Sequence, residues 1–222
     1  MPTPEAAAPP EAPRDCPICP RLTAYREANR AAHPDWFNGA APSFGDPGAR
    51  LLVVGLAPGR TGANRTGRPF TGDHAGLLLY ETLIAAGFAR GPYEARADDG
   101  LTLIDCMITN AVRCAPPGNK PATTEEAACR PFLASRIAAL PRLKVIVTLG
   151  DVSRRNVLRA LGLKASAGIA GHGTEFQAGR YTVLNSYHCS RLNTNTGRLT
   201  PAMFEAVFAR ARTLIAGGGD FR

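Results

Sequence analysis

The sequence predicts an α/β fold in which a four-stranded parallel central sheet lies between helices. From residue 51 onward, short apolar runs alternate with longer segments whose apolar residues recur at helical spacing. This strand-then-helix pattern occurs four times, which is typical of parallel sheets with helical connections. The 222 residues are 45% hydrophobic and 20% charged, so one sizeable core can form. We therefore expect a single domain.

The predicted elements follow one another in a regular order. A first helix, at about residues 20–32, lies outside the repeat. The four strand-helix units are expected at residues 50–58 with 74–88, 101–110 with 123–140, 144–150 with 151–162, and 180–187 with 200–215. The helix at 123–140 opens with two threonines and early glutamates, and we expect the threonines to cap it.

The two ends of the chain differ in composition from the rest. The N-terminal stretch MPTPEAAAPPEAPRD is rich in proline and alanine, which predicts a disordered leader over residues 1–14 that packs against nothing. The domain is expected over residues 15–216 and a flexible tail over 217–222. The stretch lacks the basic start and apolar centre of a signal peptide, and no apolar run of about 18 residues occurs. We expect a cytoplasmic protein.

Charge and topology together indicate where a ligand would bind. Lys and Arg outnumber Asp and Glu by 26 to 18, an excess that suits a polyanionic partner if it is clustered and a solvated surface if it is not. Ligands of parallel sheets bind at the carboxyl ends of the strands. The segments expected there are GLAPGRTGANRTGRPFTGD (55–73), TNAVRCAPPGNKP (109–121), TLGD (148–151) and HCSRLNTNTG (188–197).

Four of the six cysteines form a pattern typical of a metal site. Cys16 and Cys19 form a C-P-I-C pair, and Cys114 and Cys129 flank a proline-rich loop and a helix start. Two thiolates from a short turn and two from a separate loop suit tetrahedral zinc or an iron–sulfur cluster. The alternative is four ordinary buried thiols. The remaining two cysteines, Cys106 and Cys189, are not expected to be ligands.

The other candidate residues lie in the polar segments. Arg60, Arg65 and Arg68 are threaded through glycines before Phe70 and Asp73, which indicates a positive pocket with one aromatic plate and one carboxylate; the alternative is a basic turn with Phe70 in the core. The segment lacks the spacing of a nucleotide-binding P-loop. Asn110 and His188 lie at the ends of later strands. The Asn110 amide could contact a ligand or cap a helix or turn. The His188 imidazole could contact a ligand or have a structural role.

Taken together, the segments 55–73, 109–121 and 188–200 and the four cysteines resemble the family 5 uracil-DNA glycosylases, the UDGb type of the uracil-DNA glycosylase superfamily. The resemblance implies a three-layer α/β/α sandwich, a [4Fe-4S] cluster on the four cysteines with zinc as the alternative, and excision of damaged bases from DNA. It also implies that Phe70 stacks on the flipped base, Asn110 reads its edge, His188 hydrogen-bonds the departing base, and Leu192 is a wedge.

One position departs from much of the superfamily. The segment 55–73 is the first motif of this family. Many members carry a water-activating polar residue directly after the first glycine of this motif, where this chain has Leu56. The resemblance to family 5 makes Asp73 the candidate for that role, followed by His74 and Asn64. The further contacts expected are Gly55 and Ala57 with the base, and Arg65, Ser190, Arg191, Leu192 and Asn195 with DNA.

The function expected from the resemblance is that of a monofunctional DNA repair glycosylase. It would act as a monomer on DNA containing uracil or other deaminated or damaged bases, hydrolyse the N-glycosidic bond and leave an abasic site. A bacterial-type cytoplasmic location, nucleoid-associated during repair, would follow. The alternative is a non-catalytic cluster- or zinc-bearing module that binds uracil- or abasic-site-containing DNA. Asp73 together with His188 favours the enzyme.

Overall fold

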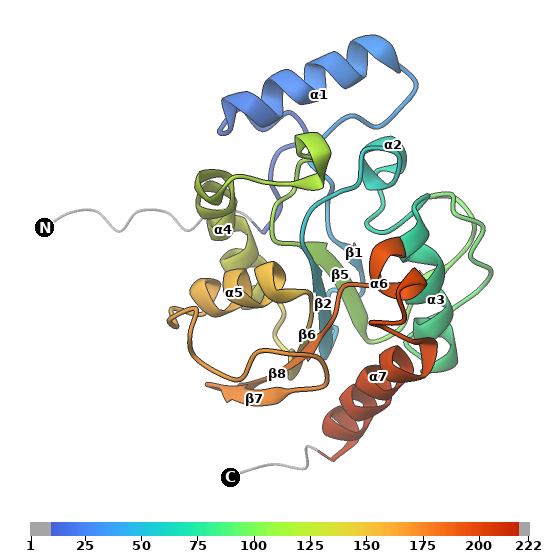
Figure 1. The fold of residues 1–222 in the computed structure, drawn as a ribbon, viewed down its shortest axis with the longest axis vertical. Helices are drawn as coiled ribbons and strands as arrows, with labels where there is room; N and C mark the ends of the chain where they lie inside the picture. Colours follow the sequence, from blue (N-terminus) through green and yellow to red (C-terminus); the bar gives the residue numbers. More distant parts are fainter. Residues whose placement is uncertain (1–9, 218–222) are drawn as a thin grey trace, which may run out of the picture.

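The computed structural model describes residues 10–217 and has a six-stranded sheet at its centre, between two layers of helices (Figure 1). The strand order is β1-β5-β2-β6-β8-β7. The inner four strands are parallel, as predicted, and the two edge strands are antiparallel additions to them. The strands are β1 Phe44–Gly45, β2 Leu51–Gly55, β5 Cys106–Asn110, β6 Val145–Leu149, β7 Glu175–Ala178 and β8 Tyr181–Ser186.

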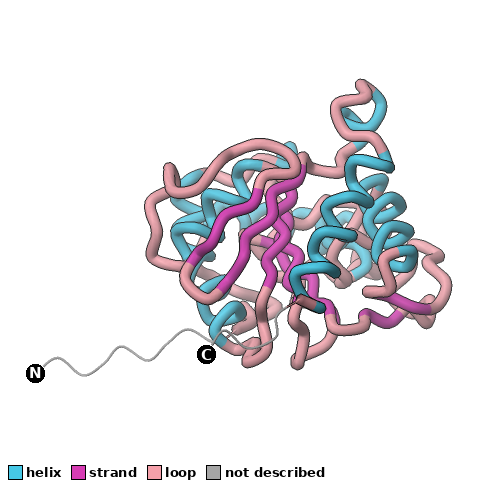
Figure 2. The backbone as a smooth tube through the Cα atoms, turned by 90° about the horizontal axis from the view of Figure 1, so that it is seen from below, coloured by secondary structure: helices cyan, strands magenta, loops and turns pink. Residues whose placement is uncertain are grey.

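Helices cover both faces of this sheet, as the view along it in Figure 2 shows. The long helices are α1 Pro20–Ala32, α3 His74–Ala85, α4 Thr123–Ala138, α5 Asp151–Ala160 and α7 Pro201–Ala216. Short helices follow strand ends at α2 Ala63–Thr66, η1 Pro117–Asn119 and α6 Arg191–Asn195, and β3 Ala89–Arg90 pairs with β4 Thr102–Leu103. Among the helices in the described part of the chain, none combines the length and hydrophobicity that a membrane span requires.

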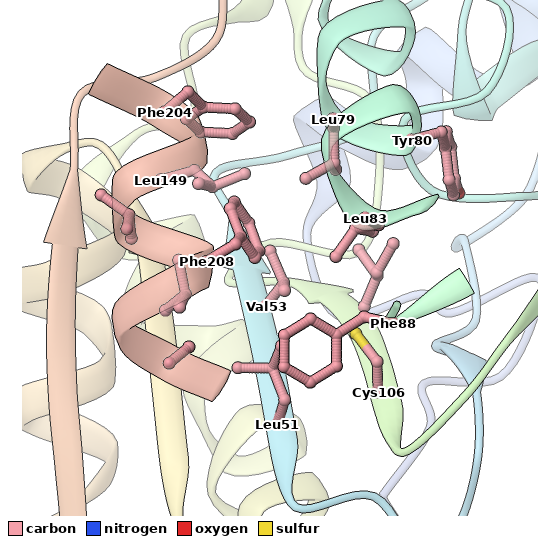
Figure 3. Close-up of a cluster of buried hydrophobic side chains, with 14 of the residues drawn as sticks. Leu51, Val53, Leu79, Tyr80, Leu83, Phe88, Cys106, Leu149, Phe204 and Phe208 are labelled. Carbon is pink, nitrogen blue, oxygen red and sulfur yellow. The ribbon is translucent and has the colours of Figure 1, made fainter. Parts of the chain in front are cut away.

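Strand β2 shows why the sheet needs both layers. All five of its residues are buried, as in a parallel strand covered on both faces. Leu51 and Val53 belong to the core formed with α3 and α7, which Figure 3 shows around Phe204 and Phe208. The alternate residues of β2 belong to a second core with α4 and α5. The period of two along the strand thus divides the apolar residues between the layers.

Two expectations about local structure were wrong. The strand expected over 101–110 is interrupted, because Asp105 adopts a positive φ of 53° and its carboxylate accepts hydrogen bonds from the Arg50 main chain and side chain. The threonines do not cap α4. The residue before the helix is Ala122, whose amide donates to Glu125 Oε2 at 2.7 Å, so the glutamate supplies the N-terminal hydrogen bond.

Residues 10–14 of the expected leader pack on the domain, contrary to the prediction for that part of the stretch. Glu11 forms ion pairs with Arg113 and Arg136, and Arg14 donates to the Phe37 carbonyl at 2.6 Å. A carboxylate and an arginine within the proline-rich stretch therefore attach it to the fold. The rest of the predicted leader, residues 1–9, and residues 218–222 of the predicted tail lie outside the described residues.

Candidate functional site

A pocket of about 420 Å³ lies at the carboxyl ends of the parallel strands. Three of the four predicted segments line it, through residues that include Ala57, Phe70, Asn110 and His188. The strand register explains this convergence, because Gly55 at the end of β2 is the direct neighbour of Asn110 at the end of β5. The fourth segment, TLGD, lines an adjoining pocket instead, which shares His188.

Phe70 is held at the pocket by an unusual backbone conformation. Its φ is 54°, and its carbonyl accepts a hydrogen bond from Tyr93 Oη at 3.1 Å. A Cβ at Gly55 would lie 2.5 Å from Phe70 Cζ and would clash with Asn110 Oδ1, so only glycine lets the ring and the amide approach so closely. Tyr93 lies outside the motifs, and no local sequence pattern predicts its contact with Phe70.

Asn110 presents an unsatisfied acceptor. The residue is 2% exposed, and its Oδ1 has no hydrogen-bond partner among the described residues. A buried acceptor without a donor costs about 1–3 kcal/mol, which a ligand N–H could recover. The pocket therefore contains an acceptor that the fold itself leaves without a donor.

Asp73 caps helix α3 and faces the pocket. Its Oδ1 accepts from the Gly76 amide at 3.0 Å, and its Oδ2 lies against the turn formed by Gly59 and Gly62. Burial raises the pKa of Asp73 above its ordinary value, against the opposing effect of hydrogen bonds from the Gly76 and Ala75 amides. The carboxylate thus combines a structural role with a position suited to chemistry.

His188 follows strand β8 and lies near the Phe70 ring. Its ring centroid is 6.1 Å from that of Phe70, and its carbonyl accepts from Asn193 Nδ2 at 2.8 Å. Burial lowers the pKa of His188, so the imidazole is neutral near pH 7. A neutral imidazole still offers one N–H donor to a group that becomes negative.

The segment after His188 forms one edge of the pocket. Ser190 caps α6 by accepting from the Asn193 amide, and both Ser190 and Arg191 line the pocket. Leu192 is 72% exposed, an unusual placement for a leucine. Asn195 is also exposed, at the end of the same helix.

The three arginines of the first motif lie in different environments. Arg68 does not contribute to a positive pocket, because it is buried and pairs with Asp99 at 2.7 Å; that expectation was wrong. Arg65 is exposed beside the pocket and donates to the Thr61 carbonyl, whereas Arg60 lines the pocket itself. The two alternative candidates for water handling, His74 and Asn64, lie in different environments. His74 lines the pocket, and Asn64 is buried against Asn38.

The four cysteines of the predicted metal site come together outside the sheet. Cys16, Cys19, Cys114 and Cys129 line one small cavity with apolar neighbours. The Arg113 amide donates to Cys129 Sγ at 3.3 Å. Burial raises the pKa of Cys114 to about 12 and of Cys129 to about 11, with further increases from the neighbouring cysteines.

This donor set fits a thiolate-bound cluster in its chemistry, since all four donors are sulfur and a main-chain N–H supports one of them. Among residues 10–217, however, no group of three or more His, Cys, Asp or Glu side chains is arranged to hold a metal ion. The other two cysteines, Cys106 and Cys189, lie apart from this site in the core beside α3 and α7.

Comparison with known proteins decides the family. The family model described as "Uracil DNA glycosylase superfamily" matches residues 42–212. The chain belongs to this superfamily. It is 45% identical over 207 residues to a type-5 uracil-DNA glycosylase of Thermus thermophilus, covering 90% of this chain and 93% of the relative. A type-5 uracil-DNA glycosylase of Pyrobaculum aerophilum is 40% identical, covering 89% and 88%.

A more distant match has a different type. A type-4 uracil-DNA glycosylase of Pyrobaculum aerophilum is 33% identical over 153 residues, which cover 68% of this chain and 64% of the relative. The identity and coverage are thus higher for the type-5 relatives. The resemblance to family 5 is confirmed, and so is the α/β fold of the superfamily.

Proposed function

We propose that the protein is a uracil-DNA glycosylase that flips uracil out of DNA and hydrolyses its N-glycosidic bond. The observation that carries the proposal is the pocket itself, where an unpaired amide oxygen, an aromatic ring, a neutral imidazole and a carboxylate meet at one strand edge. The 40–45% identity to type-5 uracil-DNA glycosylases over about 90% of the chain supports the same activity.

Each side chain has a task in base capture. Extruding a nucleotide from the duplex costs a few kcal/mol, and stacking on Phe70 returns about 1–3 kcal/mol. Asn110 Oδ1 accepts from an N–H on the edge of the base, which satisfies the buried acceptor. Because an amide also carries donors, a rotated Asn110 can pair with other deaminated bases. Arg191 and Ser190 hold the backbone while Leu192 fills the vacated space.

Bond cleavage then separates two charges. The base leaves with the electron pair of the glycosidic bond and becomes anionic, and the His188 N–H stabilises this charge. The sugar becomes cationic at C1′, where water adds and gives up a proton. In its ionised form, Asp73 stabilises that cation and accepts the proton. The products are the free base and an abasic site, with no covalent intermediate and no cut in the strand.

The cysteine site belongs to the same proposal. A [4Fe-4S] cluster would be held by Cys16, Cys19, Cys114 and Cys129. Its role would be structural: the thiolate bonds would join the segment before α1, the loop after β5 and helix α4. The protein would act as a monomer in the cytoplasm, associated with the nucleoid during repair.

A single-turnover assay tests the function. Wild-type protein is mixed in excess with a duplex that contains one uracil, and strand scission is measured with and without alkali. We expect alkali-dependent scission at the uracil and none in the matching thymine duplex. Binding to the duplex without base release would leave a non-catalytic binding module and refute the enzyme.

A further inference from the structure

Arg60 is fixed at the pocket by three side chains: an amide, an imidazole and an indole. Its Nε donates to Asn29 Oδ1 at 2.8 Å, its Nη2 lies 3.0 Å from His33 Nε2, and its Cζ lies 5.3 Å from the centroid of the Trp36 ring. His33 stacks on Trp36 in turn, with centroids 3.9 Å apart. The end of helix α1 and the residues after it therefore hold an arginine of the first motif.

The charge of Arg60 is not compensated within the described structure. None of the ion pairs among residues 10–217 includes Arg60. A guanidinium has donors only, so His33 Nε2 is the acceptor in this contact. Of the five N–H groups of Arg60, these contacts use two and leave three. The side chain is exposed and borders the pocket.

An ordered, unpaired guanidinium is suited to an oxyanion. Its fork of donors matches a phosphate in a bidentate geometry, and fixing it before binding reduces the entropy lost on contact. A flipped nucleotide stays joined to its strand on both sides, so phosphates must pass the mouth of the pocket. Arg191 lines the same pocket from another segment, the start of α6.

We infer that Arg60 binds a backbone phosphate of the DNA strand that carries the flipped base, and that Asn29, His33 and Trp36 are its positioning residues. The inference rests on the proposed function and adds a contact to it. The strand is then held at the pocket by two arginines, one after β2 and one at the start of α6.

The test compares Arg60→Ala with a matched control, Arg180→Ala. Arg180 is also exposed, without an ion pair among residues 10–217, and stacked on an aromatic ring, with its Cζ 5.0 Å from the Tyr181 centroid. It lies in the turn between β7 and β8, at the end of the sheet away from the pocket. The affinity for an abasic duplex is measured across a salt series. Arg60→Ala should shallow the slope of log Kd against log salt by about one, and Arg180→Ala should not.

Two variants of His33 test the positioning role. His33→Ala removes the acceptor without altering Arg60, so we expect affinity to fall several-fold at low salt. His33→Gln provides an amide oxygen for the same bond and should recover most of the lost affinity. The thermal stability of both variants is measured as well and should equal that of the wild type.

Two results would overturn the inference: an unchanged slope in Arg60→Ala, or an equal change in Arg180→Ala. Base release by wild-type protein from a uracil duplex is measured in parallel. If wild-type protein excises uracil while Arg60→Ala keeps the slope, the Arg60 contact is refuted and the function stands. Binding with the expected slope change but without excision refutes the function and leaves the contact.

Discussion

Glu11→Gln should destabilise the protein although the residue lies in a proline-rich N-terminal stretch. The Glu11 carboxylate is the ion-pair partner of Arg113 at 2.8 Å and of Arg136, and it accepts from the Ser43 amide at 3.0 Å. The Arg113 side chain is 1% exposed and that of Arg136 is 13% exposed. Removing the carboxylate charge leaves both guanidinium groups without an anionic partner among the described residues.

The magnitude follows from distance and exposure. Two unit charges 2.8 Å apart attract by about 6 kcal/mol at an effective dielectric constant of about 20, which is an upper bound. Breaking a buried pair costs about 3–5 kcal/mol. The Glu11 side chain is 30% exposed, so solvent screens part of this, and we expect a loss of about 2–3 kcal/mol. For a domain of this size that lowers Tm by about 5–10 °C.

The pH dependence of this loss identifies its cause. Burial raises the pKa of Glu11, but attraction to Arg113 and the Ser43 hydrogen bonds outweigh it, and the pKa is lowered from its ordinary 4.5. The stabilisation is therefore present above pH 4.5 and disappears as pH falls through the lowered value. Wild type and Glu11→Gln should differ in Tm at pH 7 and converge in acid.

The control for Glu11→Gln is Glu94→Gln. Glu94 pairs with Arg96 on the surface, with side chains 56% and 62% exposed, so its loss should cost no more than about 0.5 kcal/mol. Equal Tm values for wild type and Glu11→Gln at pH 7 would refute the reasoning. A difference that persists in acid would assign the effect to packing instead of charge.

Four further predictions concern the site. Protein purified without oxygen should contain iron and sulfide, and Cys19→Ala should lose the visible absorbance and lower Tm; stoichiometric zinc without iron would contradict this. His188→Ala should slow single-turnover excision about a hundredfold or more and leave binding to abasic DNA intact. Asp73→Asn should slow excision and abolish the fall in rate at acid pH, since burial raises the Asp73 pKa and the wild-type carboxylate protonates as pH decreases; an unchanged rate would move water handling to His74. Asn110→Ala should change the ranking of bases, whereas uniform losses across substrates would make its role structural.

The fold was predictable where burial alone decides the structure. The runs around Leu51–Gly55 and Val145–Leu149 are short, rich in β-branched residues and buried throughout, as is typical of strands covered on both faces. The edge strand Phe44–Gly45 has two residues and no period to detect. The break at Asp105 depends on a hydrogen bond to Arg50, 55 positions earlier in the chain, which local patterns do not contain.

The candidate site was predictable where a strand end determines the position of a residue. Gly55, Asn110 and His188 each end or follow a parallel strand, so topology brings them to one edge. Arginines on a loop have no such constraint. Arg68 turned inward because Asp99 offers a bidentate partner in a distant loop, and nothing within the first motif distinguishes it from its neighbours.

The position of Asp73 explains two glycines of the first motif. Their pattern first suggests a phosphate cradle, but it lacks the spacing for one. A Cβ at Gly62 would clash with Asp73 Oδ2, and one at Gly59 would lie 3.2 Å from the same atom. These positions therefore leave room for a carboxylate that helix α3 fixes through its first amides. Since an asparagine at position 73 can cap the helix equally well, the fold should tolerate Asp73→Asn, and a loss of excision in that variant would report the missing charge.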